Sequence, residues 1–158
     1  MSYLHLLHKK LPDDVLLNFG KNGDTVQGLQ KRIQKLRFKQ IADLGFIWIG
    51  TNEILVQSSW SYDVYKKLYK KPWSKYQDEL KKEYHSILDI LTKKNSYIIT
   101  VPPILIGEDP TSRWNQELGE MAEMIKELSA TYNNVEYLDL RNLFIKQLPK
   151  KTHSQSAS

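Results

Sequence analysis

The chain has 158 residues, 41% hydrophobic and 26% charged, which is the length and balance of one globular domain with a buried core. Its 7 Gly and 6 Pro exclude collagen-like and low-complexity chains, and the absence of cysteine excludes disulfides, thiolate metal sites and a catalytic thiol. Lys and Arg exceed Asp and Glu by 23 to 18, and this excess lies in local runs typical of solvated helix faces.

Short apolar runs alternate with amphipathic stretches, which predicts an α/β domain with a mostly parallel sheet. In chain order, the pattern predicts a helix over Ser2–Leu11, a strand over Asp14–Gly20, a helix over Asp24–Leu36, a strand over Leu44–Gly50, a helix over Ser74–Lys94, a strand over Ser96–Pro103, a helix over Ser112–Tyr132 and a strand over Val135–Leu140. We expect one domain over residues 1–148 and a flexible tail over 149–158. With no signal peptide or membrane span evident in the sequence, a cytoplasmic location is the default expectation.

Two loops follow the first two predicted strands, where a doubly wound sheet presents such loops side by side. They are "NFGKNGDT" and "IGTNEI". A glycine leading into a helix offers a free backbone N–H, and an asparagine at a strand end offers an amide donor, so Gly23 and Asn52 could together bind an oxyanion. The alternative is that Gly23 only forms a turn and Asn52 only caps the next segment.

The same two loops lie in segments that resemble a known family. "NFGKNGDTVQGLQKRI" and "FIWIGTNEIL" are similar to the second and third conserved blocks of SGNH (GDSL-type) hydrolases. The similarity continues through "IITVPPILIGEDPTSRWNQELGEMAEMIKEL" and "NNVEYLDLRNLF", so it covers about residues 2–144.

This resemblance implies a three-layer α/β/α, flavodoxin-like fold and a serine esterase that hydrolyses acyl or acetyl esters through an acyl-enzyme. It implies Gly23 and Asn52 as the oxyanion hole, a small-molecule or carbohydrate ester as substrate, and neither cofactor nor metal.

The sequence departs from the family pattern at the triad. The third block reads Gly50-Thr51-Asn52-Glu53 where Gly-x-Asn-Asp is usual, a lengthened carboxylate. The first block, a strand followed by Gly-Asp-Ser, is not found, and Ser2 belongs to the helix that follows it. The Asp-x-x-His block is not found either, because Lys150 stands three residues before His153. We therefore expect a truncated or inactive esterase with no nucleophile of its own.

The missing first strand belongs between the strands predicted over Asp14–Gly20 and Leu44–Gly50. Either another chain fills the gap, or the two strands close up, or the sequence is an excerpt of a longer protein. A homo-oligomer or a strand-donating chain is accordingly a candidate partner.

Aromatic residues alternate with lysines over residues 60–76. Trp60, Tyr62 and Trp73 follow the presumed oxyanion loop and could form a substrate lid, although packing against the domain is the preferred explanation. The alternative function is a non-catalytic module of the same fold that binds a partner through this segment, nucleic acid being the least favoured partner.

Overall fold

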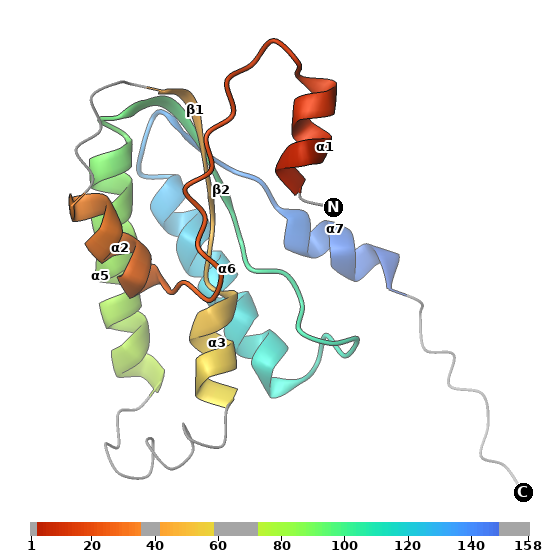
Figure 1. Cartoon of the computed structure of the whole chain (residues 1–158). Coiled ribbons are helices and arrows are strands. Elements are labelled where there is room, and N and C mark those ends of the chain that lie inside the picture. The colour runs from red at the N-terminus through yellow and green to blue at the C-terminus, as the bar shows by residue number, and fades with distance from the viewer. Residues whose placement is uncertain (1–2, 36–41, 59–72, 149–158) are drawn as a thin grey trace, which may run out of the picture.

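The chain folds around a parallel sheet with helices on both sides (Figure 1). The structure is a computed structural model and describes residues 3–35, 42–58 and 73–148. In chain order the elements are α1 (Tyr3–Lys10), α2 (Val26–Lys35), β1 (Ala42–Trp48), α3 (Thr51–Ser58), α5 (Trp73–Leu91), β2 (Asn95–Val101), α6 (Arg113–Ser129), β3 (Val135–Tyr137) and α7 (Leu140–Gln147).

The sheet has the strand order β1-β2-β3, and both pairings are parallel. Phe46 of β1 lies opposite Ile99 of β2, which lies opposite Glu136 of β3. Parallel neighbours need a crossover connection, and α5 and α6 provide the two crossovers. The strand ends that precede α3 and the loop before α6 therefore lie at the same edge of the sheet.

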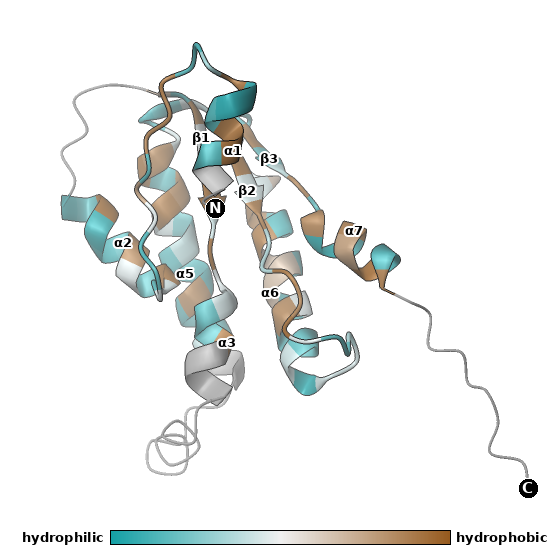
Figure 2. Ribbon diagram, turned by 45° about the vertical axis from the view of Figure 1, so that its right-hand side comes forward, coloured by the Kyte–Doolittle hydropathy of each residue, from teal (hydrophilic) through white to brown (hydrophobic). Residues whose placement is uncertain are grey.

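One face of the sheet carries the core. α2, α5 and α6 cover it, and α1 and α7 lie on the other side (Figures 1 and 2). Ile47 and Ile98 point from the strands into a cluster with Tyr84, Leu88 and Ile125, all of them buried. Burying each such aliphatic side chain contributes about 1.5–3 kcal/mol, so this cluster fixes the helices to the sheet.

The opposite face of the sheet is much more open. Leu44, Phe46 and Trp48 alternate with buried positions along β1 and are 46%, 55% and 49% exposed. Tyr97 on β2 continues this face at 39% exposed. Alternation with a period of two is the mark of a strand with one covered face, whereas the sequence predicted strands buried on both faces.

The strand predicted over Asp14–Gly20 is wrong. The segment runs extended beside β1 (Figure 1), but within the described residues no backbone hydrogen bond joins it to β1. Val15 and Leu17 are 87% and 65% exposed. A strand is defined by its hydrogen-bonded neighbour, so an apolar run without one stays irregular. Of the three alternatives for the missing first strand, the one in which the two strands close up is therefore not what the structure has.

The remaining predicted elements are confirmed, with shifted ends. The strand predicted over Val135–Leu140 stops at Tyr137 because Asp139 caps a further helix, α7. Neither α7 nor α3 was predicted from the sequence. Within the described part of the chain, no helix combines the length and apolarity needed to cross a membrane.

Candidate functional site

The loop over residues 20–25 meets the first turn of α3. The Asn52 side-chain amide Nδ2 donates to the backbone carbonyl of Asp24 over 2.8 Å, across 28 residues of sequence. The next residue, Glu53, accepts a hydrogen bond from the backbone N–H of Val26, the first residue of α2. Consecutive residues of α3 thus hold the loop and the helix that follows it.

The loop has little packing of its own. Gly23 is exposed and has a φ of 71°, and a Cβ built on it would meet nothing within 4 Å. Thr25 Oγ1 accepts the backbone N–H of Gly28 over 3.1 Å, which caps the N-terminus of α2. A Cβ at Gly28 would lie 2.3 Å from Asp24 Oδ1, so this glycine leaves room for the capping side chains.

Arg32 ties the loop to the preceding segment. Its Nε donates to Asp24 Oδ2 over 3.0 Å, and its Nη1 donates to the backbone carbonyl of Phe19 over 2.9 Å. Asp24 is nearly buried, so its charge needs this guanidinium partner. The last residues of the extended segment, the loop and α2 are therefore joined by one side chain.

Gly50 sets the approach of the β1 end to α6. Its φ is 125°, and a Cβ there would lie 2.4 Å from Met121 Sδ and 3.4 Å from Pro103 Cγ. Only glycine allows this backbone conformation and this contact together. The glycine thereby places Thr51 and Asn52 at the start of α3, close under α6 and the loop after β2.

Glu53 is the most perturbed carboxyl group at this site. It is 2% exposed, and Oε2 is buried without a hydrogen-bond partner among the described residues. Burial raises the pKa of Glu53 from 4.5 to about 7, against the lowering effect of the Val26 N–H, while the charges of Glu83 and Asp24 raise it further. The carboxyl group therefore changes charge near neutral pH.

A second loop, after β2, is held by hydrogen bonds from Asn115 on α6. Its Oδ1 accepts the Ile106 N–H over 2.9 Å, and its Nδ2 donates to the carbonyls of Ile106 and Asp109 over 3.0 and 2.6 Å. Arg141 of α7 donates to the carbonyls of Ile104 and Asn115 over 3.3 and 2.6 Å. Burial lowers the pKa of Arg141. These two side chains fix the second loop that borders the strand ends.

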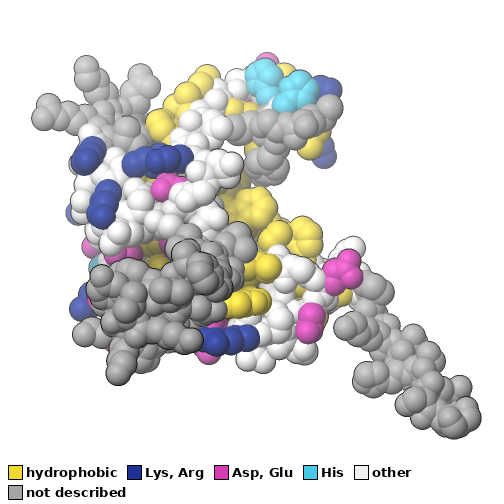
Figure 3. Space-filling view, turned by 60° about the horizontal axis from the view of Figure 1, so that its bottom comes forward, with side chains coloured by type: hydrophobic (Ala, Val, Ile, Leu, Met, Phe, Trp, Pro, Cys, Tyr) yellow, Lys and Arg dark blue, Asp and Glu magenta, His cyan; other side chains and the backbone are white. Residues whose placement is uncertain are grey.

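Viewed from the end where the strands finish, hydrophobic side chains gather in a hollow of the surface (Figure 3).

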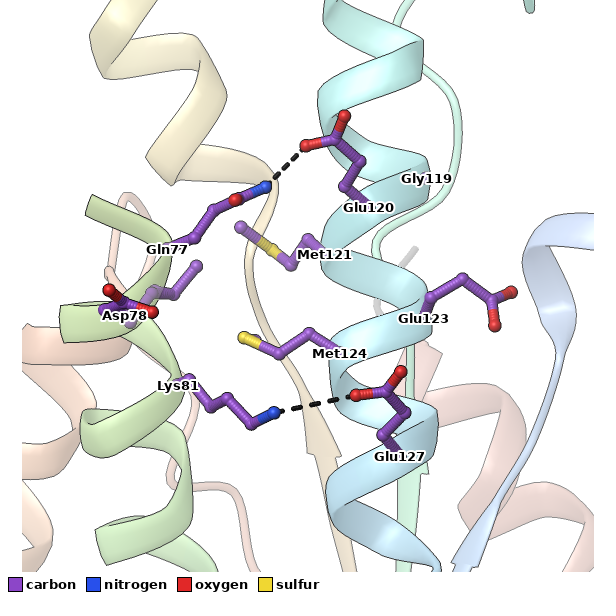
Figure 4. Close-up of a pocket in the computed structure, with 10 residues that line it drawn as sticks. Gln77, Asp78, Lys81, Gly119, Glu120, Met121, Glu123, Met124 and Glu127 are labelled. Carbon is purple, nitrogen blue, oxygen red and sulfur yellow. Dashed lines mark hydrogen bonds and ion pairs between the residues drawn. The ribbon is translucent and has the colours of Figure 1, made fainter. Parts of the chain in front are cut away.

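A separate groove lies between α5 and α6, with Met121 and Met124 at its base (Figure 4). Two interactions cross this groove: Gln77 donates a hydrogen bond to Glu120, and Lys81 forms an ion pair with Glu127 over 3.6 Å. Neither the 20–25 loop nor Asn52 lines this groove, so it is not the predicted oxyanion site.

The structure brings Asn52 to the residue that follows Gly23, but their role as oxyanion donors stays a prediction. Of the predicted lid, Trp60 and Tyr62 lie outside the described residues, and Trp73 begins α5 with its side chain not described. Within residues 3–35, 42–58 and 73–148, no three His, Asp or Glu side chains are arranged to hold a metal ion.

Sequence reasoning missed Glu53 and Arg141 as parts of this edge. In the sequence Glu53 stands out only as a lengthened carboxylate, whereas in the structure it is buried, accepts the Val26 N–H of α2 and feels the charge of Glu83 on α5. No signal marked Arg141, because α7 itself was not expected. Asn115 had a partial signal, since it stands three residues after Ser112, whose side chain caps α6.

A parallel sheet between helix layers, with two tethered loops at the strand ends, is the α/β architecture expected of the SGNH-type fold. The model of the GDSL-like Lipase/Acylhydrolase family matches residues 1–156, and the chain belongs to that family. Comparison with curated protein sequences gives no match.

Solved structures share the fold. An acetylxylan esterase from Geobacillus stearothermophilus, in a catalytic mutant with serine replaced by alanine, matches with a TM-score of 0.72 and 21% identity. An alpha/beta hydrolase from the metagenome of Lake Arreo, Spain, matches with a TM-score of 0.71 and 16% identity. In both cases the match covers 90% of this chain and 63% of the other. The chain thus spans less than two thirds of these proteins.

Proposed function

We propose that this chain carries the oxyanion-binding half of an ester-hydrolase site, in which the Gly23 N–H and the Asn52 amide stabilise the charge that develops on an attacked acyl carbonyl. The observation that supports it is the 2.8 Å hydrogen bond from Asn52 Nδ2 to the carbonyl of Asp24. That bond holds the amide donor beside the loop that contains Gly23.

The donor chemistry of both groups suits this role. An asparagine amide has two N–H protons, so Asn52 can give one to Asp24 and keep the other for an oxyanion. The Gly23 N–H belongs to an exposed residue without a side chain, at a helix N-terminus that favours negative charge. A fixed donor in such a position contributes about 3–4 kcal/mol to the transition state.

We propose that the substrate is an acyl or acetyl ester of a small molecule or a carbohydrate. Membership of the GDSL-like Lipase/Acylhydrolase family supports ester hydrolysis. Acetyl esters are included because a solved structure of the same fold, 21% identical to this chain, is an acetylxylan esterase. The acyl group is therefore open between these alternatives.

We further propose that this chain alone turns over esters only feebly. The mutants of the similar acetylxylan esterase that are described as catalytic replace a serine, an aspartate and a histidine. In this sequence no Gly-Asp-Ser occurs, and Lys150 stands where an aspartate would precede His153. An oxyanion hole without a triad gives roughly 10³–10⁴-fold acceleration over water.

Intact-mass analysis after fluorophosphonate treatment tests the missing nucleophile, with hydrolysis of an activated acetyl ester measured in parallel. We expect no adduct and slow hydrolysis that Asn52→Ala reduces and Asn142→Ala, an exposed control, does not. A stoichiometric adduct would show an activated serine and overturn the low-turnover proposal. Hydrolysis unchanged by Asn52→Ala would overturn the oxyanion assignment and favour a binding module.

A further inference from the structure

We propose that Glu53 is a positioning residue for the Gly23 and Asn52 pair, because its carboxylate fixes the 20–25 loop against the first turn of α3 by accepting the Val26 N–H. This inference rests on the proposed function, since it concerns the geometry of the same two donors. It assigns a role to a side chain that sequence comparison treats only as a variation in length.

Val26 N–H is one of the backbone donors that an α-helix leaves unpaired at its start. Thr25 Oγ1 caps Gly28 from within the same segment, whereas the acceptor for Val26 comes from a different element. Val26 is completely buried, so removing Glu53 takes away the hydrogen-bond acceptor of its N–H inside the fold. The position of the α2 start thus depends on Glu53.

Two hydrogen bonds of opposite direction join the same two elements. Asn52 donates to the carbonyl of Asp24, and Glu53 accepts from the N–H of Val26. Arg32 already holds Asp24 from α2, and the two bonds to neighbouring residues of α3 fix the orientation of the loop against α3 as well as its distance. The loop needs that restraint, because nothing packs within 4 Å of the Cβ position of Gly23.

The charges around Glu53 make this contact sensitive to protonation. Asp24 from the loop and Glu83 from α5 act on its carboxyl, and Arg32 of α2 partly balances Asp24. From α6 no charged side chain contributes to its pKa shift. Because burial places the pKa of Glu53 at about 7, the strength of the Val26 bond should change over the neutral range.

Glu117 offers a matched control. It is a second buried glutamate at 7% exposed, it lies on α6, and its Oε2 also lacks a hydrogen-bond partner within the described residues. Its Oε1 accepts from Arg113 Nε over 3.0 Å and does not contact the 20–25 loop. A change that merely loosens the protein should therefore look alike in Glu53 and Glu117 variants.

The experiment is amide hydrogen exchange and ¹⁵N NMR on the intact 158-residue chain. We expect Glu53→Ala to raise the exchange rate of the Val26 amide by about tenfold or more, and to move the Gly23 and Asn52 side-chain amide resonances. Glu117→Ala should leave all three unchanged. Glu53→Gln, which keeps the shape and an acceptor oxygen, should remove a wild-type titration of the Val26 amide centred near pH 7.

The proposal is overturned if Glu53→Ala leaves the Gly23 and Asn52 signals in place, or if Glu117→Ala moves them equally. It is also overturned if the Val26 titration survives in Glu53→Gln. These signals report loop geometry and not turnover. The positioning role of Glu53 can therefore be confirmed where the ester-hydrolase proposal fails, or refuted where that proposal holds.

Discussion

Replacing Glu53 by Gln should make the stability of the protein less sensitive to a rise in pH from 5 to 8. The pKa of Glu53 is raised by burial from 4.5 to about 7 in the folded state. The folded protein therefore binds this proton more tightly than the unfolded chain does. The free energy of unfolding must then fall as the pH rises through this interval, because ionising the group is easier in the unfolded state.

The size of the effect follows from the two pKa values. With 4.5 for the unfolded chain and about 7 for the folded one, the wild type loses about 2–3 kcal/mol of stability between pH 5 and pH 8 from this group. Glu53→Gln cannot ionise, so it loses none of this. Other titrating groups are common to both proteins and cancel in the difference.

The assay is urea unfolding of wild type, Glu53→Gln and Glu117→Gln at pH 5 and pH 8. We expect the free energy of unfolding of Glu53→Gln, relative to wild type, to be about 2–3 kcal/mol higher at pH 8 than at pH 5. Glu117→Gln controls for placing an amide at a buried carboxyl position. Equal pH dependence in wild type and Glu53→Gln would refute the reasoning.

Four further substitutions test the packing of the core and of the loops around the site. Gly50→Ala should lower the free energy of unfolding by about 3 kcal/mol or more, since it adds backbone strain to a 2.4 Å contact with Met121, whereas Gly23→Ala, strained but unobstructed, should cost about 1–2 kcal/mol; urea unfolding compares them. Tyr84→Phe should leave thermal stability equal or raise it, because the hydroxyl is buried without a partner within the described residues, and a fall in Tm would contradict this. Asn115→Ala removes three bonds to the loop after β2 and should cost about 3 kcal/mol while speeding amide exchange at Ile106; unchanged exchange there would show that the loop is held otherwise.

The helices of the core-covering layer could be predicted because their apolar stripes reflect what they bury. Tyr84 and Leu88 stand one helical turn apart on α5, Ile125 belongs to the apolar stripe of α6, and all three are buried in the structure. The strand predicted over Asp14–Gly20 failed because pairing is not a local property. Its apolar residues suit a strand, but within the described residues no strand pairs with it.

The site was only half visible in the sequence. Gly23 and Asn52 have residue types and loop positions that predict convergence, and Asn52 indeed bonds to Asp24. The hydrogen bond from the Val26 N–H to Glu53 could not be predicted, because nothing in the sequence shows that this glutamate is buried. Burial by distant elements changes both its hydrogen bonding and its pKa.

The open face of β1 should cause native molecules of this protein to associate as the protein concentration rises. Leu44, Phe46 and Trp48 are about half exposed, and β1 borders the sheet. Apolar area and unpaired strand amides on a folded molecule favour association of native protein rather than of unfolded chains. Ammonium sulfate, which strengthens apolar burial, should therefore promote self-association. Urea at concentrations below the unfolding transition should reverse that association.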